Sequence, residues 1–270
     1  MKTKSNILII AGSDSSGGAG IQADIKTVTA LGSYAMTAIT AVTAQNTKGV
    51  KQITPIPVEN VKKQIIMALD DIGVDGVKIG MLHNSNIIKC VYNILKKYKL
   101  KNIVVDPVMI AKGGQKLINN SSIKYLTKLL MPLSYLITPN IPEAEVLTGY
   151  TISNKKDMIK AAKKILNMGS QNVLLKGGHL KNKMIFDILA TKKGIKIFPK
   201  RKIRSKNTHG TGCTLSSALV TCLSQNKDIM KSCKISLKYV SRAIATAPGY
   251  GSGYGPLNHL VSFNLKKNNA

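Results

Sequence analysis

The sequence lacks tryptophan altogether and has only three phenylalanines, so few side chains could stack on nucleic-acid bases. Acidic residues are scarce too: 12 aspartates and glutamates stand against 40 lysines and arginines, which gives a net charge of +28. Basic surfaces can bind phosphate backbones, but these lysines are scattered rather than gathered in one long run. We therefore attribute the charge to compositional drift and expect no nucleic-acid partner. A nucleic-acid-binding protein remains the alternative from another functional class.

Long hydrophobic runs and paired cysteines are also missing. Near the N-terminus, the five apolar residues Ile7–Ala11 are too few for a signal-peptide core or a membrane span. The cysteines show no CxxC spacing, which indicates neither a zinc site nor a disulfide framework; they are Cys90, Cys213, Cys222 and Cys233. The sequence therefore predicts a cytoplasmic protein without a membrane partner.

Short apolar segments alternate with amphipathic ones along most of the 270 residues. The apolar segments are typical of buried parallel strands and the amphipathic ones of helices. This alternation favours a parallel sheet with helices on both faces, in one α/β domain over residues 1–270 with a core at about 5–263. The predicted strands are 7–11, 35–45, 52–57 (an edge strand), 76–80, 102–109, 135–138, 172–178 and a hairpin of 185–191 and 195–199. The predicted helices are 21–31, 58–71, 84–98, 121–130, 155–168, 211–223 and 230–247, with a short one ending at 147.

A glycine-rich stretch, Asn207–Thr214, leads directly into one of these helices. Glycine lets successive N–H groups point at one spot, and a helix N-terminus adds unpaired donors and the positive end of its dipole. We interpret the stretch as an anion hole for a phosphate or a transferring phosphoryl group; a plain loop before a core helix is the alternative. Cys213 falls on the first helical turn, where its thiolate would be favoured.

Polar side chains follow several predicted strands, at the strand ends where ligands bind in parallel α/β sheets. Asp106, Asn140 and Glu143 offer the oxygen atoms that Mg²⁺ prefers, although Asn140 and Glu143 could instead form a helix cap. Lys176 could pair with nucleotide phosphates or be an ordinary solvated lysine. Gln45 carries an amide that could read the edge of a heteroaromatic ring or simply end a strand. Together these groups predict phosphoryl transfer.

Two lone histidines, His83 and His209, are assigned structural or solvent roles.

Eight segments, in order, resemble those of bacterial hydroxymethylpyrimidine/phosphomethylpyrimidine kinases, which belong to the ribokinase-like superfamily. The most specific of them are Gly12–Asp24 and Thr208–Thr214. The others are 43–47, 78–82, 105–109, 138–144, 175–179 and 255–259. The segment Gly249–Tyr254 departs from the more regular Gly/His pattern that the family leads us to expect, which leaves the role of this C-terminal loop open.

The resemblance implies a single-domain ribokinase-like three-layer α/β/α sandwich with a mostly parallel central sheet, usually a homodimer. It also implies an enzyme of thiamine biosynthesis. Such enzymes use ATP and Mg²⁺ to phosphorylate 4-amino-5-hydroxymethyl-2-methylpyrimidine to its monophosphate and then to the diphosphate. The nearest alternative is a pyridoxal or pyridoxine kinase of the same fold.

Residue roles follow from the resemblance by position. The pyrimidine pocket would be lined by Gly12, Asp24, Gln45, Val108 and Cys213, with Gln45 on the ring edge. Mg²⁺ and its waters would be organised by Asp106, Asn140 and Glu143. ATP phosphates would be contacted by Lys176, Thr208, Gly210 and Gly212. The catalytic groups would be the anion hole at Gly210, Thr211 and Gly212 and the Cys213 thiol, which stands where many sugar kinases of the superfamily have an aspartate base.

Overall fold

The computed structural model describes residues 3–109, 118–180 and 183–262. Their centre is a nine-stranded sheet in the order β3-β2-β1-β4-β5-β6-β7-β8-β9. The strands are β1 (Asn6–Asp14), β2 (Tyr34–Asn46), β3 (Gly49–Pro55), β4 (Gly76–Ile79), β5 (Asn102–Val105), β6 (Leu136–Ile137), β7 (Asn172–Leu175), β8 (Met184–Thr191) and β9 (Gly194–Arg201). Six adjacent strands in this order are parallel to one another, namely β2, β1, β4, β5, β6 and β7. The predicted mostly parallel sheet is therefore confirmed. The predicted core boundary at residue 263 lies outside the described residues.

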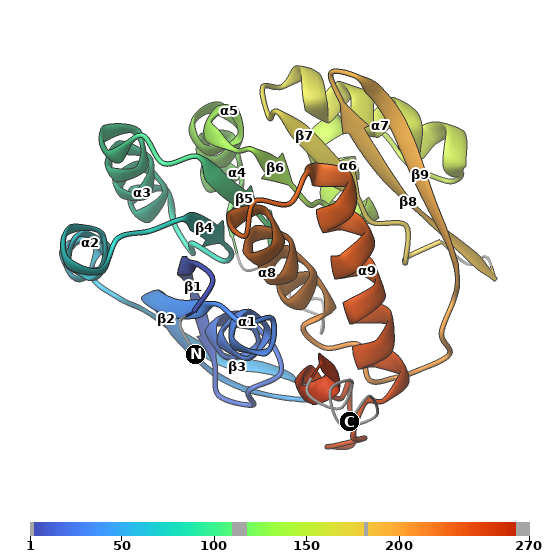
Figure 1. The fold of residues 1–270 in the computed structure, drawn as a ribbon, viewed down its shortest axis with the longest axis horizontal. Helices are drawn as coiled ribbons and strands as arrows, with labels where there is room; N and C mark the ends of the chain where they lie inside the picture. Colours follow the sequence, from blue (N-terminus) through green and yellow to red (C-terminus); the bar gives the residue numbers. More distant parts are fainter. Residues whose placement is uncertain (1–2, 110–117, 181–182, 263–270) are drawn as a thin grey trace.

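Helices cover both faces of the sheet and make three layers (Figure 1). They are α1 (Gly20–Ala30), α2 (Val58–Met67), α3 (Ser85–Tyr98), α4 (Asn120–Tyr125), α5 (Met131–Leu133), α6 (Ile141–Thr148), α7 (Lys155–Asn167), α8 (Thr211–Ser224) and α9 (Ile229–Ala245). Helices α1, α8 and α9 lie on one face, and α2, α3, α6 and α7 contribute to the core on the other. The α/β/α architecture expected from the alternation is therefore present.

The central strand β1 shows why the chain forms two cores. Its residues are apolar and buried along nearly its whole length, as expected for a strand covered on both faces. Side chains alternate between the faces, so Leu8 and Ile10 join one core while Ile7 and Ile9 join the other. A continuous apolar run, rather than an alternating one, is what this position in the sheet requires.

Both edges of the sheet are antiparallel. β3 pairs with β2 at one edge, and the hairpin β8–β9 extends the sheet beyond β7 at the other. The predicted edge strand and hairpin are thus confirmed. Two predicted helices end differently from the prediction, because their last turns are π-helical at Ala68–Ile72 and Leu126–Leu130. Apolar periodicity cannot distinguish a single π turn from an α turn.

The strand order fixes where a ligand can bind. From β1 the chain runs to β2 on one side and later returns to β4 on the other, so the connections diverge at the carboxyl ends of these strands. Such a divergence leaves a crevice beyond the strand ends in open α/β sheets.

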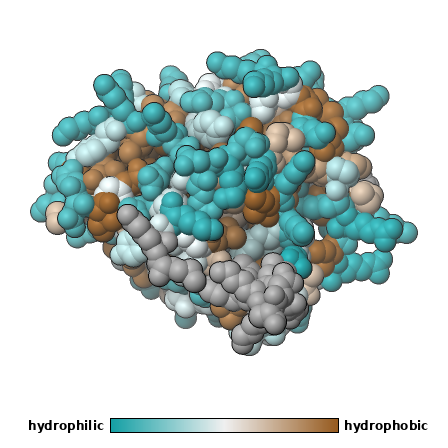
Figure 2. Space-filling view, in the orientation of Figure 1, coloured by the Kyte–Doolittle hydropathy of each residue, from teal (hydrophilic) through white to brown (hydrophobic). Residues whose placement is uncertain are grey.

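The face of the molecule in Figure 2 is mainly hydrophilic, with smaller hydrophobic areas between the polar side chains. Within the described residues, no helix is both long and apolar enough to cross a membrane.

A buried histidine near the C-terminus makes the stability of this fold depend on pH. Burial, with a smaller contribution from the charge of Lys26, lowers the pKa of His259 to about 4. Its Nε2 lies 3.0 Å from Thr214 Oγ1 at the start of α8, so the ring ties the C-terminal segment to that helix. As the pH falls below about 6.5, the unfolded chain takes up a proton that the folded chain excludes. Stability must therefore decrease between about pH 6.5 and pH 4.

We predict that acidification lowers the unfolding free energy of His259→Gln by about 3 kcal/mol less than that of the wild type. Urea unfolding at several pH values measures this difference. The exposed Lys192 provides the control, because Lys192→Gln keeps the buried His259 ring and should lose as much stability on acidification as the wild type does. An identical pH dependence for the wild type and His259→Gln would contradict the assignment.

Candidate active site

A cavity of about 620 Å³ opens beyond the carboxyl ends of the central strands. This volume lies in the range of small-molecule sites. Twelve of the thirteen residues predicted for the site line the cavity: Gly12, Gln45, Asp106, Val108, Asn140, Glu143, Lys176, Thr208, Gly210, Thr211, Gly212 and Cys213. They come from the ends of several strands and from the N-terminus of α8, so the sheet brings together residues that are far apart in the sequence.

The N-terminus of α8 forms one wall of the cavity. Gly210 is its N-cap and has φ +77°, a left-handed conformation that favours glycine. A Cβ atom at this position would also overlap the backbone of Gly18 in the loop after β1. The first turn of a helix leaves its N–H groups without acceptors inside the helix, and residues Gly210–Cys213 line the cavity. The predicted anion hole therefore lies where a ligand can reach it.

Cys213 differs from the prediction. We expected the helix N-terminus to favour its thiolate, but burial raises the pKa of this thiol to about 12, although the Lys78 charge and a hydrogen bond from the Gly20 backbone oppose the shift. The negative charges of Asp24 and Asp106 add to the increase. At neutral pH the group is thus a neutral thiol, and the expectation of a lowered pKa is wrong.

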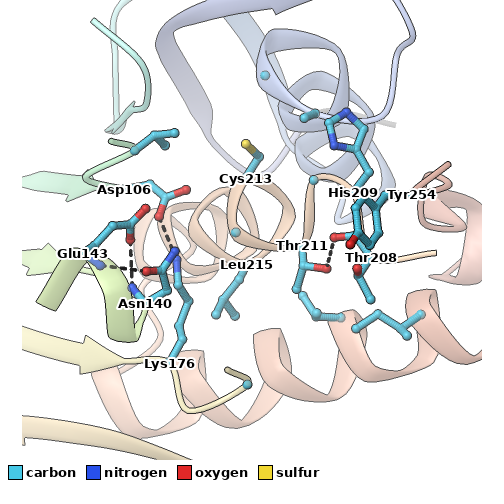
Figure 3. A pocket seen from close by; sticks show the side chains of 18 of the residues that line it. Asp106, Asn140, Glu143, Lys176, Thr208, His209, Thr211, Cys213, Leu215 and Tyr254 are labelled. Carbon is cyan, nitrogen blue, oxygen red and sulfur yellow. Dashed lines mark hydrogen bonds and ion pairs between the residues drawn. The ribbon is translucent and has the colours of Figure 1, made fainter. Parts of the chain in front are cut away.

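Figure 3 shows Cys213 between His209 and an ion pair formed by Lys176 and Asp106. Lys176 Nζ is 2.9 Å from Asp106 Oδ1, and the same oxygen accepts a hydrogen bond from Thr138 Oγ1 at 3.0 Å. Lys176 is partly exposed to the cavity, whereas Asp106 is buried. Burial would lower the pKa of Lys176, but the carboxylates of Asp106 and Glu143 raise it, so the ammonium stays charged. The cavity therefore holds a positive charge beside the Asp106 carboxylate and the carboxyl group of Glu143.

Asn140 and Glu143 form the helix cap that the sequence left open as an alternative. The Asn140 side chain accepts from the Glu143 N–H at 2.9 Å, and Glu143 Oε2 accepts from the Asn140 N–H at 2.8 Å. Both residues also line the cavity, so the cap orients them toward it. Burial raises the pKa of Glu143 to about 7, with Lys176 opposing the shift and Asp106 adding to it.

These residues fit Mg²⁺ held through phosphates and water. Within the described residues there is no group of three or more histidine, cysteine, aspartate or glutamate side chains arranged to hold a metal ion. Asp106 and Glu143 nevertheless bring two buried carboxylates to one end of the cavity. Mg²⁺ is usually bound by one or two carboxylates together with substrate phosphates and waters rather than by a protein cage. The donor set thus suits a nucleotide-bound metal.

Asp24 does not line the cavity, which corrects its predicted place in the pyrimidine pocket. It is fully buried and accepts hydrogen bonds from Lys78 Nζ at 2.6 Å and from Ser217 Oγ at 2.8 Å. Lys78 itself lines the cavity, and Asp24 therefore supports the site from behind. Burial alone would lower the pKa of Lys78, but the negative charge of Asp24 raises it.

The sequence analysis did not identify Lys78. A lysine in the middle of an otherwise apolar strand was the signal that could have revealed it, because a buried ammonium requires a partner of opposite charge. Gly80 leaves room for this ammonium, since a Cβ atom there would come within 2.8 Å of Lys78 Nζ.

His209 and Asp14 were also missed as site residues. Both line the cavity, and His209 Nε2 lies 2.8 Å from Asp14 Oδ2. One terminal atom of the Gln45 amide lies 3.1 Å from the same ring nitrogen. Of the structural or solvent role predicted for His209, the solvent part is wrong, since the ring is buried. A histidine beside the glycine-rich stretch gave no periodic pattern that could reveal these contacts.

Comparison with known proteins is consistent with this geometry. The sequence profile of the family described as phosphomethylpyrimidine kinase matches residues 14–258. The chain is 46% identical over 262 residues to the hydroxymethylpyrimidine/phosphomethylpyrimidine kinase of Bacillus subtilis, covering 97% of this chain and 96% of that protein. It is 47% identical over 259 residues to the thiamine biosynthesis bifunctional protein ThiED of Geobacter sulfurreducens, covering 96% of this chain but only 53% of that longer protein.

Solved structures show the same fold. A phosphomethylpyrimidine kinase from Clostridium difficile is 46% identical, with a TM-score of 0.80, and the match covers 90% of this chain and 100% of that one. A pyridoxal kinase from Bacillus subtilis in complex with ADP is 35% identical, with a TM-score of 0.89 and coverage of 97% and 99%. The arrangement of the site and the match over nearly the whole chain lead to one conclusion: the chain belongs to the phosphomethylpyrimidine kinase family.

Proposed function

We propose that this chain transfers a phosphoryl group from ATP to 4-amino-5-hydroxymethyl-2-methylpyrimidine and a second one to the resulting monophosphate, as a step of thiamine biosynthesis. The proposal rests on one observation: the helix N-terminus at Gly210–Cys213 and the Gln45 amide line the same cavity. The first could bind a phosphoryl group and the second could hydrogen-bond the edge of a heteroaromatic ring. The hydroxymethylpyrimidine/phosphomethylpyrimidine kinases that this chain resembles at 41–46% identity support the same substrate.

The chain's own groups supply positioning and charge stabilisation, on which phosphoryl transfer mainly relies. The Lys176 ammonium contacts the phosphates as a point charge, and the amides of Gly210 and Gly212 receive the negative charge that develops on the transferring group, since the Thr211 amide donates to the Thr208 carbonyl at 3.3 Å. Thr208 and Thr211 hold this loop together, since the Thr211 hydroxyl donates to the Thr208 carbonyl at 2.8 Å.

Cys213 acts at the acceptor. Its thiol lies at the same helix terminus and can take the proton of the substrate alcohol only after losing its own, which a pKa of about 12 makes rare at rest. The second acceptor is a phosphate that is already ionised and requires no base. The thiol therefore matters for the first transfer and much less for the second.

Asp106, Asn140 and Glu143 would hold Mg²⁺ and its waters beside Lys176, and Mg²⁺ would neutralise charge on the nucleotide phosphates. The homodimer, the cytoplasmic location and the absence of a nucleic-acid partner stay predictions, as does a single domain over residues 1–270.

A pyridoxal kinase is the second candidate, because a pyridoxal kinase from Bacillus subtilis shares this fold with a TM-score of 0.89. Both reactions need an anion hole and a pocket for a substituted heteroaromatic ring. The number of phosphoryl groups added separates them, since only the pyrimidine pathway requires two.

The central test is mass analysis of the products formed from ATP, Mg²⁺ and the aminopyrimidine alcohol. We expect a species with two added phosphoryl groups. Preference for pyridoxal in parallel turnover measurements, together with a single phosphorylation of either compound, would overturn the assignment in favour of the second candidate.

Replacing the phosphate lysine should impair nucleotide use. For Lys176→Met we expect kcat/KM for ATP to fall roughly 100-fold, because a fixed charge at the transferring group is lost. Lys192→Met is a matched control on the exposed β8–β9 turn and should change kcat/KM less than twofold, which is roughly the scale of neutral surface substitutions. A decrease of less than about threefold in Lys176→Met would show that the lysine does not contact the phosphates.

The thiol should matter for one step only. Cys213→Ala is expected to slow phosphorylation of the alcohol by roughly 100-fold or more and that of the monophosphate by less than tenfold. Because the thiol pKa is about 12, the ionised fraction in the wild type increases with pH across the neutral range, and the alcohol step should accelerate with it. Single-turnover assays of each step between about pH 6 and pH 9 check both points. Equal slowing of the two steps would mean that the thiol is not the base.

A further inference from the structure

Four side chains at one end of the cavity form a hydrogen-bond chain whose directions can be worked out. They are Thr43, Gln45, His209 and Asp14, and all four line the cavity. The terminal atoms of the Gln45 amide have different neighbours: Nε2 lies 3.1 Å from His209 Nε2, and Oε1 lies 3.2 Å from Thr43 Oγ1. The oxygen and nitrogen of a side-chain amide are assigned from the groups they face.

The contacts of Asp14 determine which ring nitrogen of His209 carries the proton. Asp14 Oδ1 accepts from the N–H and the hydroxyl of Ser16, each at 2.8 Å, and Oδ2 accepts from the Gly18 and Ala19 amides at 3.2 and 2.8 Å. Burial would raise the Asp14 pKa, but hydrogen bonds from His209 and Ser16 outweigh it and lower the pKa. Asp14 is thus a carboxylate that can only accept, so the proton between it and His209 sits on Nε2.

The contacts of Thr43 determine which atom of the Gln45 amide can face its hydroxyl group. The Thr43 hydroxyl has one proton, and it donates that proton to the Ser13 carbonyl at 2.8 Å. Its oxygen can then only accept from Gln45. Both neighbours therefore favour exchanging the amide oxygen and nitrogen of Gln45 from the positions given above, so that the oxygen faces the protonated Nε2 of His209 and the nitrogen faces Thr43.

The imidazole has little freedom to turn away from this arrangement. His209 is buried, and its backbone N–H donates to the Gly255 carbonyl at 3.1 Å. A Cβ atom at Gly18 would come within 2.5 Å of His209 Cδ2, so glycine at this position lets the ring lie against the loop after β1.

We infer that His209, held by Asp14, is a positioning residue that locks the Gln45 amide in one orientation and thereby decides which way round the pyrimidine ring binds. This inference rests on the proposed function. A 4-aminopyrimidine edge offers an amino donor beside a ring-nitrogen acceptor, which pair with the amide oxygen and nitrogen respectively. The lock puts the amino group on the His209 side and the ring nitrogen on the Thr43 side.

The consequence concerns the reacting group. In the proposed substrate the hydroxymethyl carbon is attached next to the carbon that bears the amino group. Fixing the amino group on the His209 side therefore directs the hydroxyl to the flank where His209 leads into Gly210 and the N-terminus of α8. A rotated amide would turn the ring over and carry the hydroxyl toward Thr43, away from that helix terminus.

The lock predicts strong discrimination against the 4-oxo analogue, 5-hydroxymethyl-2-methylpyrimidin-4-one, whose edge carries a ring N–H and a carbonyl and so reverses the pattern. For the wild type we expect kcat/KM for the amino substrate to exceed that for the oxo analogue by roughly 100-fold or more. In His209→Phe the amide can rotate, and we expect this ratio to fall by about tenfold or more. Thr43→Val leaves the contact between His209 and the Gln45 amide in place, so the ratio should stay within about threefold of the wild-type value.

A purely structural role for His209 would lower turnover of both substrates equally and leave the ratio unchanged, and that result would overturn the inference. A second measurement does not depend on a folded variant. Nitrogen-15 NMR of the wild-type histidines at about pH 8 should show His209 protonated at Nε2, and a proton at Nδ1 alone would overturn the lock. Absence of any turnover of the aminopyrimidine by the wild type would defeat the proposed function and the ring orientation with it, whereas the NMR result, obtained without substrate, tests the lock itself.

Discussion

The site depends on the close approach of two backbone loops, one after β1 and one before α8. They meet at Gly18 and Gly210, where a side chain on Gly210 would overlap the backbone of Gly18 and a side chain on Gly18 would collide with His209. The N-terminus of α8 lines the cavity beside this contact, and Asp14 lies within hydrogen-bond distance of His209. Glycine is needed for space at both positions, and at Gly210 also for its left-handed backbone.

Charge in the cavity is arranged in buried pairs. Lys78 is paired with Asp24 and Lys176 with Asp106, at 2.6 and 2.9 Å. Each pair keeps its lysine charged in a place where burial alone would favour the neutral form. Both lysines therefore remain charged in the site, while burial, together with the nearby carboxylates, keeps the Cys213 thiol neutral.

Specificity within this fold can rest on very few atoms. The chain shares its architecture with kinases named for pyrimidine and for pyridoxal substrates, at 46% and 35% identity. Under the proposed function both kinds of reaction use the same anion hole, so the difference would lie where the ring binds. The proposed contact for the ring is Gln45, whose amide has His209 on one side and Thr43 on the other. On this proposal a single proton on His209 decides which ring edge is accepted.

The sequence by itself determined the layered α/β fold, because apolar runs such as Ile7–Ala11 and amphipathic helices such as α3 carry their own periodicity. It also identified the residues at the strand ends, since a parallel sheet gathers those ends at one edge. Only the tertiary structure decided the contacts between them. It moved Asp24 behind the cavity, reversed the expected pKa shift of Cys213, and joined His209 to Asp14 across 195 positions of the chain. Burial and long-range partners set these properties, and neither is encoded in the local order of residues.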